Sequence, residues 1–322
     1  MLAGLLYGLI LWRVGPGKIA HAFADFRPAY LLLTPLFLLA MVFLKGLKWR
    51  LILRYYGIPY PIKESIMTWC VGALAGGLTP GQSGEVLKIL YVKERTGHPY
   101  AQCLNTVILD KVFELASMLS LVAIALLLFP FKSSGSLPYL PFIAGIAIIG
   151  VIIYALLSHG FAGRIIPLLF TAPWLHKRKD VGAVLQRFFG ELVRIRDDGR
   201  LFLLLLGLSL LTWAIIFMHL YVIALAVRLG ASPPEMLLAL PLITFVGVLP
   251  ISLSGLGSRD AAAIFLLGSF GVPAEGAVAW STLSFLAHSA VTMLLGWVFM
   301  MVLPPILGKK RMPISPSQSR RQ

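Results

Sequence analysis

The stretch GGLTPGQSGEVLK, residues 76–88, decides how this sequence is interpreted. Apolar runs flank it on both sides, yet it contains a proline, several glycines and the carboxylate of Glu85. Proline and glycine interrupt helices. Irregular backbone at membrane depth is tolerated only where it is buried in protein or lines a cavity. The stretch therefore indicates a helix that is broken inside a membrane domain.

The composition around this stretch is that of a membrane protein. Of 322 residues, 58% are apolar and only 13% are charged, whereas soluble domains carry about 25% charged residues. The runs between Lys132 and Arg164 and between Arg200 and Arg228 contain no charge. Each is long enough to cross roughly 30 Å of hydrocarbon. We therefore predict an all-α polytopic transmembrane helix bundle over residues 1–308, followed by a disordered basic tail at 309–322.

Four of the expected helices are too short to span a membrane, and a Pro/Gly/Ser loop splits each pair of them. We interpret these two pairs as re-entrant or broken-helix hairpins beside about six full spans. The short segments are 64–78, 85–95, 236–250 and 259–270, and the longer apolar segments are 2–14, 29–47, 101–129, 138–158, 201–228 and 275–303.

The two hairpins resemble each other in sequence. SGE at 83–85 is followed by GHP at 97–99, and SRD at 258–260 is followed by GVP at 271–273. Three expected spans separate the copies, and an odd number places them on opposite faces of the membrane. This pattern predicts an inverted repeat of about 29–129 and about 201–303.

The acid in each loop has two interpretations. In the local one, Ser83 and Ser258 cap the half-helices, and Glu85 and Asp260 favour the positive ends of the helix dipoles. In the other, the two half-helix starts also meet in a polar site near the midplane, which suits anionic groups such as phosphates. The sequence leaves both open.

Further charges stand inside the span 101–129. Asp110, Lys111 and Glu114 occur within five residues, and each charge at a helix centre costs roughly 2.5–3.5 kcal/mol on insertion scales. They form either an internal network that only locks helices, or a cavity wall that contacts substrate, or they lie near the interface. The intramembrane charges then sum to −2, from four acids and two bases: Glu85, Asp110, Glu114 and Asp260 against Lys111 and Arg259.

The other basic residues are distributed unequally between the two sides of the predicted membrane domain. Segments 45–63, 86–98, 159–200 and 304–322 fall on one side and hold 21 Lys and Arg, against five on the other side. The positive-inside rule makes the richer side cytoplasmic. We expect a bacterial inner membrane and cytoplasmic termini. Within 159–200 we expect an amphipathic helix, either on the cytoplasmic membrane surface or as a linker helix that faces the solvent. The net charge of +15 thus does not indicate a nucleic-acid partner.

Nothing in the sequence predicts a metal or a cofactor. Cys70 and Cys103 both lie in apolar surroundings and form no disulfide or metal-binding pattern. His219 and His288 stand in apolar spans, where a helix–helix hydrogen bond is the expected role.

Four stretches carry a family resemblance: LTPGQSGEVLKILYVKERTG at 78–97, TVILDKVFEL at 106–115, LPISLSGLGSRDAAAIFLL at 249–267 and GVPAEGAVAWSTL at 271–283. Together they resemble the lysylphosphatidylglycerol synthase transmembrane-region family of flippase-like proteins. This chain departs from the family pattern at three positions. Lys111 stands where an arginine is usual, Ser254 where a glycine is usual, and Asp260 where a glutamate is usual. Lysine does not reproduce a bidentate arginine contact, so the resemblance does not carry over a substrate.

This resemblance implies lipid translocation without the separate cytosolic synthase domain of the bifunctional members. Those members flip aminoacylated phosphatidylglycerol, and stand-alone members are associated with glycolipid, polyprenyl-linked sugar and hopanoid pathways. The expected partners are membrane lipids with anionic or zwitterionic head groups, and enzymes of lipid or glycan synthesis. The expected lipid-binding residues are Pro80, Gln82, Ser83, Gly84, Glu85, Asp110, Lys111, Glu114, Ser254, Gly255, Gly257, Ser258, Arg259 and Asp260.

Two other functions stay open. One is a non-transporting membrane partner of a lipid or glycan synthesis pathway. The other is an intramembrane enzyme, either a lipid-linked glycosyltransferase or a protease resembling rhomboids through GQSG at 81–84 and His288. The separation of Ser83 and His288, 205 residues, is far larger than rhomboids use, so a transporter is the favoured interpretation.

Overall fold

The structure is a computed structural model that describes residues 2–24, 26–128, 147, 198–249 and 254–303. All regular structure in these residues is helical, which confirms the predicted all-α class. Four helical segments are long and apolar enough to cross a membrane: 28–55, 100–128, 199–226 and 274–302. The expected span 138–158, most of the surface segment 159–200 and the tail 309–322 lie outside the described residues.

The helices before and after residue 147 form two sets with the same order. Each set has a long helix, a hairpin of two short helices and a second long helix. The first set is η1 (Pro28–Leu33) with α3 (Thr34–Tyr55), α4 (Ile62–Gly77), η2 (Pro80–Leu87) with α5 (Lys88–Thr96), and α6 (Tyr100–Leu128). The second is α11 (Gly199–Ala226), α12 (Pro233–Val248), α13 (Ser258–Gly268), and α14 (Ala274–Ser284), η3 (Phe285–Ala290) and α15 (Val291–Val302).

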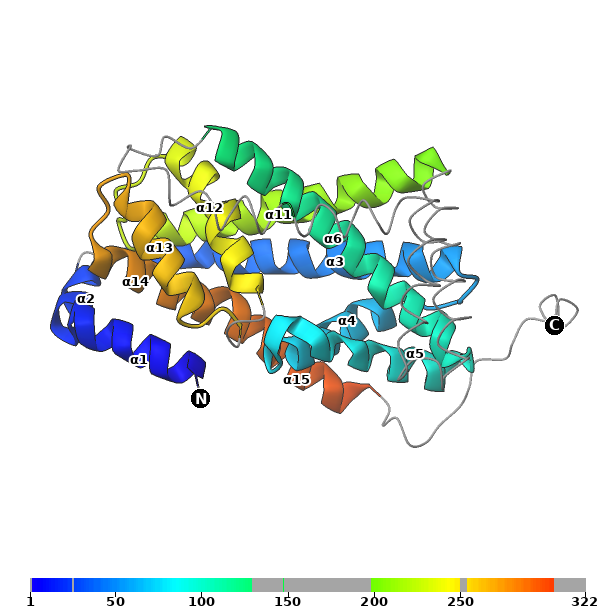
Figure 1. Ribbon diagram of the computed structural model, residues 1–322. Coiled ribbons are helices and arrows are strands. Elements are labelled where there is room, and N and C mark those ends of the chain that lie inside the picture. The colour runs from blue at the N-terminus through cyan, green and yellow to red at the C-terminus, as the bar shows by residue number, and fades with distance from the viewer. Residues whose placement is uncertain (1, 25, 129–146, 148–197, 250–253, 304–322) are drawn as a thin grey trace, which may run out of the picture.

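The two sets run in opposite directions. In Figure 1, α3 runs toward one end of the molecule and α11 runs back, and α6 and α14–α15 are likewise opposed. The sets also exchange partners: α15 packs against α4, α6 packs against α12, and α3 packs against α11. This exchange is what a two-fold relation between two sets produces. The N-terminal helices α1 (Leu2–Val14) and α2 (Pro16–Ala22) pack on the second set.

Each hairpin begins and ends at the same end of the bundle. Helix α4 starts where α3 ends, and α5 returns to that end, whereas α12 and α13 do the same at the opposite end (Figure 1). Helix α4 has 16 residues and is therefore about 24 Å long, which is short of the hydrocarbon thickness. The hairpins thus bring their turns into the middle of the bundle from opposite sides.

Helix α3 extends well past residue 47, where the sequence interpretation ended it. The helix continues to Tyr55 because Trp49, Ile52 and Leu53, all fully buried, extend the apolar stripe. Gly57, with a positive φ of 71°, then ends the run. This extension has a consequence for charge: Lys45 and Lys48 lie inside the bundle and not in a cytoplasmic connection.

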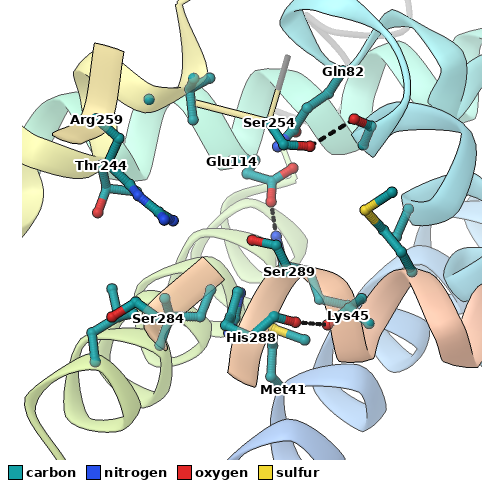
Figure 2. Close-up of a pocket in the computed structure, with 18 of the residues that line it drawn as sticks. Met41, Lys45, Gln82, Glu114, Thr244, Ser254, Arg259, Ser284, His288 and Ser289 are labelled. Atoms are coloured by element: carbon teal, nitrogen blue, oxygen red, sulfur yellow. Dashed lines mark hydrogen bonds and ion pairs between the residues drawn. The ribbon is translucent and has the colours of Figure 1, made fainter. Parts of the chain in front are cut away.

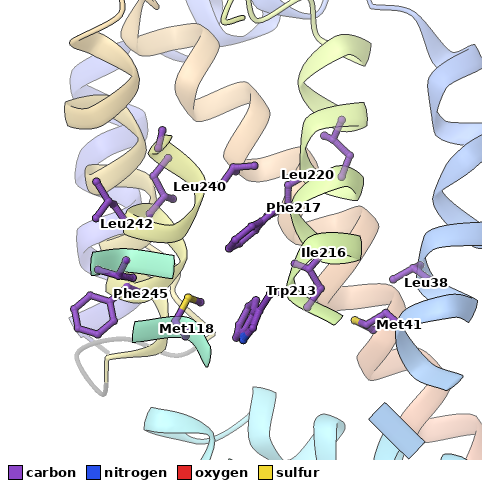
Figure 3. Packing of buried hydrophobic residues seen from close by; sticks show 14 of the residues in the cluster. Leu38, Met41, Met118, Trp213, Ile216, Phe217, Leu220, Leu240, Leu242 and Phe245 are labelled. Carbon is purple, nitrogen blue, oxygen red and sulfur yellow. The ribbon is translucent and has the colours of Figure 1, made fainter. Parts of the chain in front are cut away.

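Close packing holds the two sets together. A Cβ atom on Gly296 of α15 would overlap the carbonyl of Cys70 in α4, so only glycine allows this helix pair to approach so closely. The apolar core lies between the sets. Figure 3 shows the aromatic rings of Trp213 and Phe217 from α11 between Met118 of α6 and Met41 of α3.

Candidate functional site

The turn of the first hairpin is a tight, irregular segment. Gly81 and Gln82 both have left-handed backbone conformations, with φ of 60° and 57°. The Thr79 hydroxyl accepts the backbone N–H of Gly84 at 2.7 Å and donates to the Ala75 carbonyl. A Cβ on Gly84 would overlap that carbonyl, so this glycine is needed for the turn to pack on α4.

Helix α5 begins only at Lys88, after this turn. The predicted cap at Ser83 is therefore wrong, because Thr79 supplies the side-chain oxygen and the following residues form a 3₁₀ turn. Glu85 lies in the 3₁₀ turn that leads directly into α5. It forms ion pairs, as described below.

The second hairpin repeats the backbone but not the chemistry. Ser254 and Gly255 are the left-handed pair here, with φ of 49° and 77°. Helix α13 begins at Ser258, its cap residue is Gly257, and Asp260 accepts the Gly257 N–H at 2.7 Å. The local interpretation of Asp260 as helix-start chemistry is confirmed. Ser258 is not the cap residue, and its hydroxyl donates to the Gly255 carbonyl.

The two turns meet. The Ser254 hydroxyl donates to the carbonyl of Gly77, at the end of α4, at 2.6 Å. Both turns line one cavity of about 180 Å³ in the middle of the bundle (Figure 2). Residues of α3, α4, α6, α11, α12, α14, η3 and α15 complete its wall. The two acids of the repeat do not both face it: Glu85 lines the cavity, whereas Asp260 faces the start of its own helix and Arg259 lines the cavity in its place.

A continuous ion-pair network stands at one side of this cavity. Each of its three carboxylates contacts two lysines, and the lysines come from three different helices. Glu114 contacts Lys45 and Lys111, Glu85 contacts Lys111 at 2.5 Å and Lys88 at 3.0 Å, and Asp110 contacts Lys48 at 2.8 Å and Lys88 at 3.4 Å.

Most of this network is removed from solvent. Asp110 and Lys88 have no exposed surface, and Lys48 is 1% exposed. The stems also fit closely, since Lys88 lies over the Trp49 ring and its side chain fills the space that a Cβ on Gly72 would need. The network joins α3, α5 and α6, so it holds the first set of helices together.

Three lysines of the network were not among the predicted site residues. Lys45, Lys48 and Lys88 were counted with cytoplasmic connections, but all three are buried. With them, the intramembrane charges sum to +1 and not to −2. One signal was present in the sequence: Met41, Lys45, Lys48 and Ile52 recur at helical spacing, which places both lysines on the apolar face.

Aromatic rings line the cavity beside the network. Trp69, Trp213 and Trp280 all contribute to its wall. The Lys45 ammonium lies 5.9 Å from the ring centre of Trp69 and 5.5 Å from that of Trp213, within the range of cation–π attraction. These contacts hold Lys45 between the two rings while it pairs with Glu114.

The opposite wall is built from the second set. Arg259 donates from Nε to the Ser281 hydroxyl at 3.2 Å and from Nη2 to the Ser281 carbonyl at 2.7 Å. His288 also lines the cavity, and its Nδ1 hydrogen-bonds Nδ1 of His219 at 3.3 Å. The predicted helix–helix hydrogen bonds of the two histidines are therefore one bond between them.

The structure thus divides the predicted site residues. Five of them line the cavity, namely Gln82, Glu85, Glu114, Ser254 and Arg259. Asp110 and Lys111 belong to the network behind it, and Gln82 accepts a hydrogen bond from Lys111 at 2.8 Å. The others shape the turns and do not line the wall: Pro80, Ser83, Gly84, Gly255, Gly257, Ser258 and Asp260.

The described part of the chain was expected to hold neither a metal site nor, on the favoured interpretation, a Ser83–His288 pair. The described residues contain no group of three His, Cys, Asp or Glu side chains that could hold a metal ion. Ser83 does not line the cavity that His288 lines, and the Nδ1 atom of His288 is engaged by His219. The two residues of the protease alternative are therefore not brought together.

Comparisons with known proteins find relatives among membrane proteins. The family model of the lysylphosphatidylglycerol synthase TM region matches residues 1–296. A UPF0104 membrane protein of Methanocaldococcus jannaschii is 21% identical over 313 residues, which cover 94% of this chain and 93% of the relative. Two UPF0104 membrane proteins of Methanothermobacter thermautotrophicus are 24% and 27% identical, over 84% and 90% of this chain and 81% and 88% of the relatives. No solved structure matches significantly.

Proposed function

Because this chain belongs to the lysylphosphatidylglycerol synthase transmembrane-region family, we propose that it is a flippase-like protein that moves a phospholipid, glycolipid or isoprenoid-type lipid between leaflets. One observation carries the proposal. Two broken hairpins enter from opposite ends, and their turns meet at a cavity with charged walls. Secondary transporters place their substrate sites at such interruptions.

The cavity size fits a polar head group and not a whole lipid. The cavity has a volume of about 180 Å³. Drug-sized ligands occupy pockets of about 300–1,000 Å³. In the proposed mechanism the head group enters the cavity while the acyl or isoprenoid chains stay in the surrounding bilayer.

Two alternatives make different demands on this cavity. A non-transporting partner of lipid or glycan synthesis enzymes needs no polar cavity at the centre of the bundle. An intramembrane enzyme needs a nucleophile or base that faces the substrate, and the lysine contacts of Glu85 and Glu114 disfavour the base role. Translocation requires a polar cavity at the centre of the bundle, and it requires no nucleophile or base.

The proposed location is the cytoplasmic membrane, with the basic connections and both termini on the cytoplasmic side. The positive-inside rule supports this orientation. Lys45, Lys48 and Lys88 no longer contribute to it, because they are buried. The other basic residues of 45–63, 86–98, 159–200 and 304–322 still outnumber those expected on the opposite side.

A lipid-scrambling assay in proteoliposomes tests the proposal. Thr244 of α12 lines the cavity, and Thr244→Trp fills it. Leu237 on the same helix is 61% exposed on the outer surface, so Leu237→Trp is the matched control. We expect Thr244→Trp to lower fluorescent-lipid scrambling to the rate of protein-free vesicles and Leu237→Trp to leave it unchanged. Equal, wild-type rates in both variants, with the fold retained, would reject the cavity as the route.

A further inference from the structure

The carboxylates at the cavity are all occupied. Glu85 and Glu114, the two that line it, each contact two lysine ammonium groups. Together with Asp110, these carboxylates contact four lysines, so the network of three acids and four lysines has a net charge of +1. A positively charged ligand group beside it meets like charge, which is unfavourable in the interior. The carboxylate side of the cavity therefore does not favour a head-group amine.

Arg259 differs from the lysines because no carboxylate of the described residues lies within ion-pair distance of it. Within the described residues it forms no ion pair, and its two hydrogen bonds go to the neutral Ser281. A guanidinium has five N–H donors, so three remain. Ser281 holds Nε and Nη2, which fixes the orientation of the planar group while it lines the cavity.

A second polar group at this wall has no partner. Ser284 lies one helical turn after Ser281, is 0% exposed and lines the cavity. Its hydroxyl has no hydrogen bond within the part of the chain that the structure describes. An unsatisfied buried hydroxyl is unfavourable and calls for a ligand or water. In Figure 2, Arg259 and Thr244 lie at the upper left of the cavity, Ser284 lies below them on the same side, and Lys45 lies on the other side.

We infer that Arg259 and Ser284 form a subsite for the phosphate group of a lipid head group, and that the cavity disfavours head groups with an ammonium. Arginine matches the oxygens of a phosphate with parallel hydrogen bonds, and the serine hydroxyl supplies one further donor. This inference rests on the proposed function and names its substrate class.

Lipid binding to the purified full-length protein tests the subsite. Native mass spectrometry with phosphatidic acid, phosphatidylglycerol, phosphatidylethanolamine and diacylglycerol compares an anionic phosphate, a phosphate with an ammonium, and no phosphate. We expect the two anionic lipids to bind more tightly than phosphatidylethanolamine, and diacylglycerol to bind least. Arg259→Gln should weaken the anionic lipids at least about tenfold, as expected for hydrogen bonds to a charged group. Tightest binding of phosphatidylethanolamine overturns the inference.

Two further variants keep this test independent of folding. Arg50 donates from Nε to a backbone carbonyl, that of Tyr60, at 3.3 Å and does not line the cavity, so Arg50→Gln is the matched control with unchanged lipid preference. Ser284→Ala removes an unpaired buried hydroxyl. We expect it to unfold at the same temperature as the wild type or higher, and to bind phosphatidic acid several-fold more weakly. Unchanged binding in Ser284→Ala and Arg259→Gln overturns the subsite.

A further experiment distinguishes a lipid head group from free inorganic phosphate as the ligand of the subsite. Thermal unfolding with inorganic phosphate reports the anion alone. Stabilisation by inorganic phosphate without binding of phosphatidic acid keeps a phosphate subsite and overturns the lipid head group. Arg259-dependent binding of anionic lipids, with no scrambling by the wild type, upholds the subsite and rejects the proposed translocation.

Discussion

The turns of the two hairpins share a backbone and differ in what they present to the cavity. Each places two consecutive residues in left-handed conformations, Gly81 with Gln82 and Ser254 with Gly255. In the first turn the acid, Glu85, faces the cavity and pairs with lysines. In the second turn the acid, Asp260, points toward the start of α13 and not into the cavity, and Arg259 faces the cavity. The repeat therefore keeps its shape while its charge is divided between the two copies.

The neighbouring helices explain the division. The first turn packs beside α6, which brings Lys111, and begins α5, which brings Lys88; Glu85 compensates both. The second turn packs beside α14, which offers the uncharged Ser281. What a turn of this fold presents is thus set by its partner helix and not by its own motif.

The largest expected effect is at Asp110, in the network behind the first turn. Asp110→Asn leaves Lys48 and Lys88 buried with too little negative charge, and breaking a buried pair costs about 3–5 kcal/mol. We expect a large loss of stability in detergent, measured by thermal unfolding of the purified protein. A change below about 1 kcal/mol would show that the network is not what holds α3, α5 and α6 together.

Gly84→Ala should come next. Its Cβ meets the Ala75 carbonyl, and overpacking against backbone costs typically 1–3 kcal/mol. Gly268 is the control, because it ends the equivalent half-helix α13 and a Cβ there meets nothing within 4 Å. Unfolding measurements should show Gly268→Ala to be neutral or slightly stabilising. Similar losses in both variants would contradict the close approach at Gly84.

Asp260→Ala tests the acid of the second turn, which faces the start of its own helix. It removes the acceptor of the Gly257 N–H, and losing a cap hydrogen bond costs about 0.5–2 kcal/mol. Asp260→Asn keeps an acceptor oxygen and should recover most of the stability in the same unfolding assay. The contrast with Asp110, where asparagine does not substitute, separates a cap from an ion-pair partner. Equal damage from Asn and Ala at residue 260 would remove that contrast.

Ser254→Ala is the mildest of these changes. It deletes the hydrogen bond from the second turn to the Gly77 carbonyl, which is expected to contribute about 0.5–1.5 kcal/mol. Hydrogen exchange at residues 76–88 should report the loss, since the Gly77 carbonyl lies in that segment. Exchange that changes only around residue 254 would mean that the turns are not coupled through this bond.

The sequence predicts the helices well and the side-chain partners poorly. Hydropathy located α4, α6, α11 and α12 to within three residues, and proline and glycine located both turns. These signals are local. Whether Lys45 ends a helix or lies in its buried face depends on how far α3 continues, and that depends on burial of Trp49 and Ile52 by other helices. Likewise, no local signal says that Glu85 and Asp260 point in different directions.

The segment Phe285–Ala290 between α14 and α15 is a π-helical turn, and its helical phase has a consequence for packing. A π turn holds one residue more than an α turn, so everything after it is rotated by about 100° relative to an uninterrupted α-helix. Without that residue, Trp297 would stand where Gly296 now meets the Cys70 carbonyl. The extra residue therefore sets which side of α15 faces α4, and so how closely the two sets of helices approach.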